Sequence, residues 1–525
     1  MVFLRLSEVN RSVRPPPAHE KRDSPLPNVL KGAILIAQSP GIRGMSDNAG
    51  KDIGAALPWR PQQAGPSRRQ GEDAMQSTQP RADAVAVALP WYRTLDRAQW
   101  KALVASNLGW AFDGYELYAL VLTVGVALHQ LLDPSQYKVL PAYAGMVIAI
   151  NVLGWGIGGL IGGVVADYLG RKRTMILAIL AYSLTTGLSA LAWNWYSFAA
   201  LRLLVGIAIG SEWVTGASIM AELWPDHARG KGGGFMQCGA GIGNFLAAAI
   251  WLGLAGTGPN SWRFMYLVGV LPALFTLWVR RGIPESPRWE RADARRRAAH
   301  ERRHRGAALD REEAALTRFT VVDLFAERAV RRRLVLSLLL TLSTAVAWWG
   351  VASWIPPYVG SVAAKSGLPA PQWAALAGMI YNLVGIAGYI ALGFLADALG
   401  RKPVTMLWFL AGVVLTPVLF LWTRDAHMIL FVVGLNGFFT LGIWACLPIW
   451  LPELYPTRMR GTAVAFSFNA PRLIAFIGPL IAGTLIVALG GYGKAATIVG
   501  MFYLLGFLAA PFLPETRGKP LPESV

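Results

Sequence analysis

The sequence predicts an all-α membrane protein with 12 transmembrane helices arranged as two pseudo-symmetric six-helix bundles. Three observations favour this fold class. The chain of 525 residues is 54% hydrophobic but only 15% charged, whereas soluble globular domains carry about 25% charged residues. Its apolar runs of roughly 20 residues are long enough to cross a bilayer. A ten-residue motif recurs once, as expected when a membrane protein consists of two homologous halves.

The repeated motif occupies residues 163–172 (GVVADYLGRK) and residues 393–402 (GFLADALGRK). The aspartate of the second copy, Asp397, follows Asp167 by 230 residues. Two further pairs of signatures occur in the same order with nearly the same offset: ELWP at 222–225 with ELYP at 453–456, and PESPR at 284–288 with PETR at 514–517. Three signatures repeated in the same order indicate that the two halves of the chain arose by duplication of one six-helix unit.

Each half contributes six apolar segments to the expected fold. The twelve predicted spans are 101–130, 140–166, 174–193, 196–223, 232–255, 263–280, 334–360, 371–396, 404–423, 427–452, 462–488 and 495–513. The resulting parts are a tail over 1–99, an N-terminal bundle over 100–280, a linker over 281–333, a C-terminal bundle over 334–513 and a cytoplasmic tail over 514–525. The first tail is expected to be disordered and cytoplasmic, unless translation starts at Met45 or Met75. The Arg-rich linker is expected to be cytoplasmic, with helices lying on the membrane surface.

Lysine and arginine are concentrated in alternate connectors between these spans. The loops after the second, fourth, eighth and tenth spans carry two or three each, for example Arg171, Lys172 and Arg173. The opposite loops carry few. The positive-inside rule therefore predicts that both termini and the motif loops are cytoplasmic, in a protein that crosses the inner membrane of a bacterium many times.

Composition and motifs argue against several other classes of protein. The net charge of +19 is explained by loop Lys and Arg, because no soluble basic domain of the kind that binds nucleic acid is present. The two cysteines, Cys238 and Cys446, lie in apolar spans and are expected to be packing residues. Metal-binding spacings, phosphate-binding loops and catalytic motifs are absent. We therefore expect no cofactor, no metal and no enzymatic activity, but transport driven by an ion gradient.

From about residue 100 to 518 the chain resembles the major facilitator superfamily of transporters, whose loop signature is similar to the repeated motif. The resemblance implies a cytoplasmic gate latch that is closed while the carrier faces outward. In this latch Asp167 would cap a helix end and pair with Arg229 or a neighbour. Asp397 would pair with Arg460. The expected latch residues are Gly163, Asp167, Gly170, Arg171, Lys172, Glu222, Arg229, Asp397, Gly400, Arg401, Glu453 and Arg460. The alternative is that these charges only set the topology.

Ionisable residues inside the spans are costly to bury, so each one requires a reason. Asp113 and Glu116 lie three residues apart on one face of the first span, where two close carboxylates favour taking up a proton. Arg202 in the fourth span resembles the arginine that the superfamily uses in proton coupling. We expect Asp113, Glu116 and Arg202 to couple transport to protons. The alternative for all three is a structural ion pair that is inert in transport.

Arg472 lies about ten residues into the eleventh span, too deep to reach the membrane surface easily. A buried guanidinium needs a carboxylate, which it can hold through two hydrogen bonds. The seventh to tenth spans offer no acid near mid-membrane, so we expect a substrate carboxylate to bind Arg472. Further candidates for the substrate cavity are Glu212, Gln237, Asn244, Trp349, Trp354, Tyr381, Asn382 and Asn436. Tryptophans suit a flat or apolar substrate body, and the alternative for each polar side chain is to tie helices together.

The sequence DGYE at 113–116, together with Arg472 and the following Gly478-Pro479, resembles the aromatic acid/proton symporters. The segment around Glu212 also resembles sialate and monocarboxylate symporters. The resemblance implies a monomer that imports a small organic acid anion, such as an aromatic acid or a monocarboxylate, with protons by alternating access. A sugar or polyol proton symporter is one alternative, although the seventh span lacks the paired Gln of sugar porters. A non-transporting sensor with the carrier fold is the other.

Overall fold

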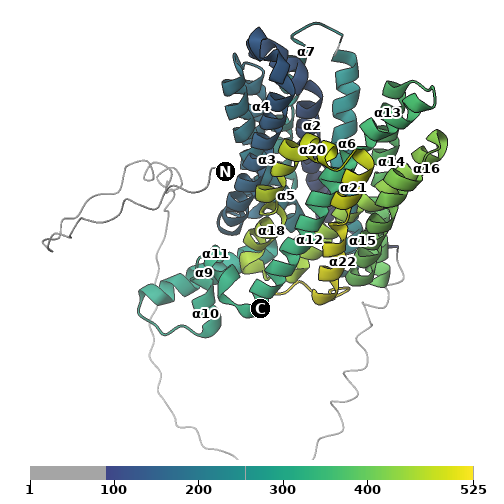
Figure 1. Cartoon of the computed structure of the whole chain (residues 1–525). Coiled ribbons are helices and arrows are strands. Elements are labelled where there is room, and N and C mark those ends of the chain that lie inside the picture. The colour runs from purple at the N-terminus through teal and green to yellow at the C-terminus, as the bar shows by residue number, and fades with distance from the viewer. Residues whose placement is uncertain (1–89, 255, 524–525) are drawn as a thin grey trace, which may run out of the picture. The chain divides into compact units, whose positions relative to one another are not determined.

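The computed structural model describes residues 90–254 and 256–523. All regular elements in this part of the chain are helices, and the long ones run side by side (Figure 1). Of the tail predicted over 1–99, residues 1–89 lie outside the described residues. The remaining ten residues contain a short 3-10 helix, Trp91–Arg93, and the first turn of the next helix.

The N-terminal half is built from helices whose ends follow local sequence signals. Its helices are α2 (Arg97–Leu131), α3 (Leu140–Leu169), α4 (Arg171–Ser189), α5 (Trp195–Leu223), α6 (Arg229–Leu254), α7 (Ser261–Val268) and α8 (Pro272–Gly282). The side chains of Asp96 and Asn194 accept hydrogen bonds from the first turns of α2 and α5, where backbone N–H groups lack partners within the helix. Gly170 forms the turn between α3 and α4 with a φ of 104°, which glycine adopts without strain.

The C-terminal half repeats this order with more interruptions. Its elements are α12 (Arg328–Ala352), α13 (Ile355–Lys365), α14 (Ala370–Leu399), α15 (Arg401–Pro417), the π-helix η4 (Val418–Trp422), α16 (Ala426–Thr440), the 3-10 helix η5 (Gly442–Ala445), α17 (Cys446–Trp450), the 3-10 helix η6 (Leu451–Leu454), α18 (Arg460–Asn469), α19 (Arg472–Ala475), α20 (Ile477–Ala488), α21 (Tyr492–Gly500) and α22 (Tyr503–Ala509). Pro471 separates α18 from α19, because proline has no N–H to continue the backbone hydrogen bonds. This break places Arg472 at the start of a new short helix.

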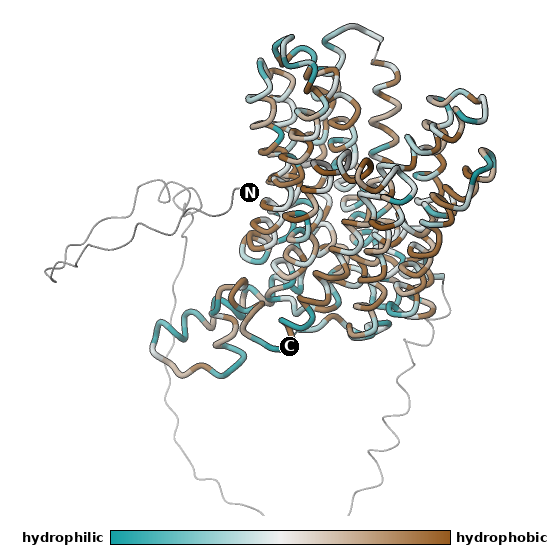
Figure 2. Tube along the Cα trace, in the orientation of Figure 1, coloured by the Kyte–Doolittle hydropathy of each residue, from teal (hydrophilic) through white to brown (hydrophobic). Residues whose placement is uncertain are grey.

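Three short helices connect the halves: α9 (Pro287–His304), α10 (Arg311–Leu316) and α11 (Thr320–Ala326). They lie together at one end of the long helices (Figure 1), and hydrophilic residues are concentrated there, whereas the long helices are largely hydrophobic (Figure 2). Arg296 on α9 donates hydrogen bonds to the carbonyl oxygens of Asp167 and Arg458, both at 2.8 Å. These bonds tie the connecting segment to both halves.

Nine helical stretches among the described residues are long and apolar enough to cross a membrane. They account for all predicted spans except the third, the sixth and the eleventh. The third is α4, a helix of 19 residues that begins with three basic side chains. The sixth is divided between α7 and α8, and the eleventh among α18, α19 and α20. Each predicted span therefore coincides with one helix or with a succession of shorter helices.

The helices α3 and α5 pack backbone against backbone through glycines on both helices. These glycines are Gly154, Gly158 and Gly162 on α3, and Gly206 and Gly210 on α5. A Cβ atom at Gly158 would overlap the carbonyl oxygen of Ile207, and one at Gly206 would overlap the carbonyl oxygen of Asn151. Small residues allow helices to approach closely inside a membrane. Because α5 carries three of the candidate charged residues, Arg202, Glu212 and Glu222, this contact sets their position relative to α3.

We expect Gly158→Ala to destabilise the protein by about 1–3 kcal/mol, because a methyl group forced into a packed contact must push the helices apart. The matched control is Gly125→Ala on α2, where no described atom lies within 4 Å of the added Cβ. Thermal unfolding in detergent, followed by tryptophan fluorescence, should have a lower midpoint in Gly158→Ala alone. Equal midpoints for the two variants would show that the α3–α5 contact tolerates a side chain.

Candidate functional site

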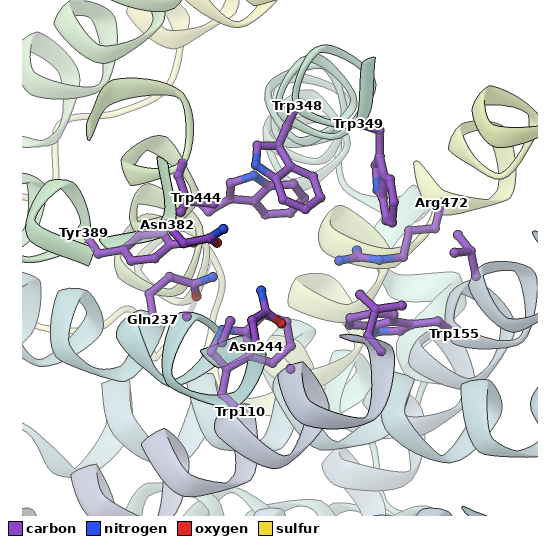
Figure 3. A pocket seen from close by; sticks show the side chains of 16 residues that line it. Trp110, Trp155, Gln237, Asn244, Trp348, Trp349, Asn382, Tyr389, Trp444 and Arg472 are labelled. Carbon is purple, nitrogen blue, oxygen red and sulfur yellow. The ribbon is translucent and has the colours of Figure 1, made fainter. Parts of the chain in front are cut away.

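A pocket lies between the two halves and has about 690 Å³ of empty volume, solvent at its mouth included. Nine of its lining residues come from α2, α3 and α6, and seven come from the C-terminal half. Figure 3 shows these side chains facing a common space. A small molecule bound there would contact both halves at once, so its binding would depend on how the halves are arranged.

Aromatic rings form much of the pocket wall. They are Trp110, Trp155, Trp348, Trp349, Tyr389 and Trp444. In Figure 3, Trp348, Trp349 and Trp444 lie on one side of the pocket, and Trp110 and Trp155 lie on the other. Trp348 meets Trp444 edge-to-face with ring centroids 5.6 Å apart, and Trp110 meets Trp155 in the same way at 5.9 Å. Walls of this kind favour a ligand with a flat or apolar body.

Arg472 brings a positive charge into this pocket from the first residue of α19 (Figure 3). Its guanidinium donates a hydrogen bond to the carbonyl oxygen of Phe468. The guanidinium carbon lies 4.0 Å from the ring centroid of Phe468 and 4.7 Å from that of Trp155. Among the described residues no carboxylate lies within 4.0 Å of the guanidinium. Because a guanidinium has five N–H donors, most of the donors of Arg472 remain for an anionic ligand.

Three uncharged amide side chains also line the pocket: Gln237, Asn244 and Asn382. Gln237 and Asn382 lie on the side of the pocket away from Arg472 (Figure 3). The amide nitrogen of Asn382 donates to the carbonyl oxygen of Gly378 at 2.9 Å, which leaves its amide oxygen for a ligand. Amides both donate and accept hydrogen bonds, so this side suits a hydroxyl or carbonyl group.

Five of the nine predicted substrate residues line the pocket: Arg472, Gln237, Asn244, Trp349 and Asn382. The other four lie elsewhere. Tyr381 and Asn436 both interact with the hydroxyl of Thr440, at 2.9 and 3.0 Å. Trp354 is buried at the start of α13, and Glu212 is buried beside Asp113. Of these interactions, Tyr381–Thr440 joins α14 to α16 and Asp113–Glu212 joins α2 to α5, each within one half.

Sequence reasoning did not select Trp110, Trp155, Tyr389 or Trp444 as substrate residues. The first of them had a partial signal, because Trp110, Gly114 and Leu117 follow the i, i+4, i+7 spacing of one helix face. In a membrane, however, an aromatic ring can face lipid as readily as a cavity. The apolar pattern therefore did not indicate which face of the helix turns inward.

The three predicted proton-coupling residues lie inside the N-terminal half. Arg202 forms a buried ion pair with Glu116 and donates a second hydrogen bond to Ser189. Asp113 is not part of this pair, although it lies one helical turn from Glu116. It is fully buried beside Glu212 of α5, with which it interacts directly. The buried charges thus divide into one ion pair and one pair of acids.

At the end of the long helices where the repeated motif lies, each half binds a helix start of the other. Asp167 on α3 accepts hydrogen bonds from the backbone N–H groups of Gly461 (3.0 Å) and Thr462 (2.8 Å) at the start of α18. Asp397 on α14 accepts equivalent bonds from the first turn of α6, at 2.9 and 3.0 Å. Carboxylates are favourable there because the first N–H groups of a helix have no partner within it.

Two crossed ion pairs join the halves at the same end. Arg460 of the C-terminal half pairs with Glu222 of the N-terminal half at 2.7 Å. Arg229 of the N-terminal half pairs with Glu453 of the C-terminal half at 2.8 Å. We call these four residues, together with Asp167 and Asp397, the clasp.

The pairing of Asp397 differs from the expected pair with Arg460, and Asp167 caps a helix start and pairs with a neighbour instead of with Arg229. Asp167 pairs with Arg171 at 3.1 Å, and Asp397 pairs with Arg401 at 3.0 Å. In the described part of the chain neither aspartate pairs with Arg229 or Arg460. The physical reason is that each aspartate already accepts two backbone N–H groups of the opposite half and pairs with the arginine one helical turn later in its own half, while Arg229 and Arg460 bind glutamates across the halves.

The other predicted motif residues support the clasp. A Cβ at Gly163 would overlap that of Ala465, so glycine lets α3 approach α18. Gly400 has a φ of 107° and turns the chain into α15, as Gly170 does before α4. Lys172 follows this turn, and its backbone N–H donates to Glu285 at 3.2 Å. The motif glycines therefore set the geometry on which the charged contacts depend.

The third repeated signature, to which sequence reasoning assigned no role, supplies a glutamate to the start of the helix that directly follows each motif turn. Glu515 accepts backbone hydrogen bonds from Arg401 (2.9 Å) and Lys402 (3.0 Å) at the start of α15, as Glu285 does at the start of α4. Burial acts to raise the pKa of Glu515, but these backbone donors outweigh it and hold the pKa below its usual value. The carboxylate is therefore charged at neutral pH, as helix capping requires.

Two homologous helical halves, a pocket between them and a clasp at one end define a membrane carrier of the major facilitator type. The chain belongs to the family described as "Sugar (and other) transporter", which it matches over residues 101–524. This is a family of transporters, not of enzymes, and the chain is a multi-pass membrane protein.

Named relatives and solved structures agree with this assignment. The chain is 27% identical to the sialic acid transporter NanX of Escherichia coli (strain K12), covering 79% of this chain and 93% of that protein. It is 28% identical to a gallate transporter of Pseudomonas putida, covering 80% and 94%. Its fold is similar to that of the proton:xylose symporter XylE, with a TM-score of 0.64 and 21% identity over 81% of this chain and 98% of that one. The predicted fold class is confirmed.

Proposed function

We propose that this carrier imports a small organic acid anion, such as an aromatic acid or a monocarboxylate, together with protons. The observation that carries the proposal is Arg472, a buried guanidinium that faces an aromatic pocket and has no carboxylate partner among the described residues. A carboxylate would bind it through two charge-assisted hydrogen bonds. The aromatic walls would hold the organic body, and the amides on the far side would bind further polar groups.

Two similarities support an acid as the substrate class. Both relatives described above are named for carboxylic acids, sialic acid and gallate. The pocket also has the elements that these acids require, which are a cation at one side and hydrogen-bonding amides at the other. The three amides are equally suited to hydroxyl groups, so a sugar or polyol is the second candidate.

In this proposal Asp113, Glu116 and Arg202 couple transport to the proton gradient. A charge inside a closed, dry cavity is costly unless an opposite charge neutralises it. Proton uptake by one of the acids would accompany anion binding at Arg472, and the neutral loaded carrier would then change conformation. A gradient can drive this cycle because proton and anion both favour the closed state over the open ones.

Alternating access would use the clasp as the cytoplasmic gate. With the clasp formed, the pocket is closed on that side, and releasing it lets the halves rock around the substrate. This assignment places both termini and the linker helices in the cytoplasm of a bacterium, in agreement with the concentration of Lys and Arg in the motif loops. We further propose that one chain forms a complete carrier, because its own two halves provide every wall of the pocket.

Uptake into proteoliposomes tests the proposed function. The panel contains labelled aromatic acids, hydroxy acids, keto acids and sugars, each with and without an inward proton gradient. We expect one or more acids to accumulate, more strongly at acidic external pH, and a protonophore to abolish this accumulation. Accumulation of sugars alone would replace the acid proposal with polyol symport. No uptake of any compound by a folded protein would favour a sensor.

A further inference from the structure

A second pair of buried acids lies behind the pocket and is distinct from the Glu116–Arg202 ion pair. Asp113 on α2 and Glu212 on α5 are both 0% exposed. Their carboxyl groups are close enough to share a hydrogen bond once one of them carries a proton. Among the described residues no donor reaches any of their four oxygen atoms. The pair is close to the pocket along the chain, because Gly114, which follows Asp113 in α2, lines the pocket.

The surroundings offer no cation to this acid pair. The other titratable side chains that interact with it are Glu116 on α2 and Tyr182 on α4. The arginine of the same half that lies well inside a span, Arg202, pairs with Glu116. Gly109 on α2 leaves room for the Glu212 carboxyl group, which a Cβ at that position would overlap. The space is therefore shaped for this carboxyl group.

Two adjacent carboxylates in a membrane interior cannot both remain charged without a cation or donors. We propose that Asp113 and Glu212 form the proton-binding site of the carrier by sharing one proton, whereas Glu116 is occupied by its ion pair with Arg202. This inference rests on the proposed function for its role in transport. It moves Glu212 from the substrate cavity to the proton site.

A contact across the two halves connects this site with Arg472. Trp213 follows Glu212 in α5, and its ring stacks on Phe468 of α18 with centroids 3.4 Å apart and planes at 10°. Phe468 is the residue whose carbonyl oxygen and ring hold the guanidinium of Arg472. The indole N–H of Trp213 also lies 3.5 Å from the amide oxygen of Gln237, which lines the pocket. Trp213 is thus a positioning residue between the proton site and the anion site.

Loss of the shared proton would place two negative charges side by side and push the carboxyl groups apart. Because Glu212 and Trp213 are consecutive in one tightly packed helix, a displacement of Glu212 that shifts the backbone of α5 also shifts Trp213. That movement would disturb the Trp213–Phe468 stack and, through it, the position of Arg472. Proton release and substrate release would then occur together, which is the requirement for symport.

Infrared difference spectroscopy tests the shared proton without any knowledge of the substrate. We expect the purified protein to show the band of a protonated carboxyl group across neutral pH, and Glu212→Gln to lose it. Glu212→Gln should fold, because the amide is isosteric and can donate to Asp113. A spectrum of Glu212→Gln identical to that of the unchanged protein would overturn the shared proton, whatever the outcome of the uptake panel.

Transport assays test the coupling role. In Glu212→Gln and Asp113→Asn we expect gradient-driven accumulation to fall at least about tenfold and its pH dependence to flatten, while exchange of labelled for unlabelled substrate persists. Trp213→Leu, which removes the aromatic ring, should weaken accumulation in the same way. Trp213→Phe, which keeps a ring to stack on Phe468, should accumulate substrate as the unchanged protein does. A normal pH profile in Glu212→Gln would overturn the assignment. If the unchanged protein transports no acid, the proposed function fails, while the infrared result still decides the proton site.

Discussion

Replacing Arg472 with alanine is expected to weaken binding of the substrate anion by at least about 100-fold. A hydrogen bond to a charged group contributes about 1.5–3 kcal/mol, and a carboxylate on Arg472 would make two of them. Each 1.4 kcal/mol corresponds to about a tenfold change in affinity. The measurement is the concentration dependence of uptake in proteoliposomes, with binding to purified protein measured in parallel.

Arg472→Lys is the informative companion variant. Lysine keeps the charge but loses the planar fork that binds both carboxylate oxygens, so we expect an intermediate affinity. Both variants should fold, because Arg472 has no carboxylate partner among the described residues whose charge would be left uncompensated. Ordinary uptake by Arg472→Ala would remove this residue from the substrate site and contradict the acid proposal.

The second large effect is expected from Asp167→Ala in the clasp. This carboxylate accepts two backbone N–H groups and the hydroxyl of Thr462 across the halves, at 2.7–3.0 Å. Removing an acceptor from buried donors costs about 1–3 kcal/mol for each group left unpaired. We therefore expect the clasped conformation to lose at least about tenfold in population relative to the open one, and uptake to fall by a similar factor.

Spin labels can report this shift directly. Leu177 on α4 and Leu407 on α15 are exposed, belong to different halves and are equivalent positions of the repeat. Double electron–electron resonance between spin labels at these two positions should show longer distances in Asp167→Ala than in the unchanged protein. The matched control is Asp425→Ala, since Asp425 caps α16 at 2.8 and 3.0 Å within one half. A control that shifts the distances as much as Asp167→Ala would show general loosening, not release of the clasp.

Local sequence was sufficient for the features that depend on one segment or on the repeat. Hydropathy placed every predicted span on a helix or a succession of helices, nine of them long and apolar enough to cross a membrane in the described part of the chain. The 230-residue offset located the clasp residues, and the depth of Arg472 in an apolar span marked it as a candidate ligand-binding cation, because burying a charge in hydrocarbon is costly whatever the neighbouring helices are.

The parts that could not be predicted depend on which helices meet. Asp113 was paired with Glu116 because both lie on one helix, but its partner is Glu212 on α5. Likewise, Asp167 was expected to pair with Arg229 or a neighbour, and the sequence did not indicate that it would bind the start of α18 and the neighbouring Arg171 while Arg229 binds Glu453. Single-sequence reasoning could not choose among such partners, because the distances between helices are set by glycine contacts that only the folded chain shows.

The reciprocal build of the clasp has a consequence for membrane leakiness. Each half holds a helix start of the other half. Breaking one set of contacts gains little freedom while the other set still holds the halves together, so we expect both sets to open in one concerted step. A partly opened gate, through which ions could leak across the membrane, would then be rarely populated.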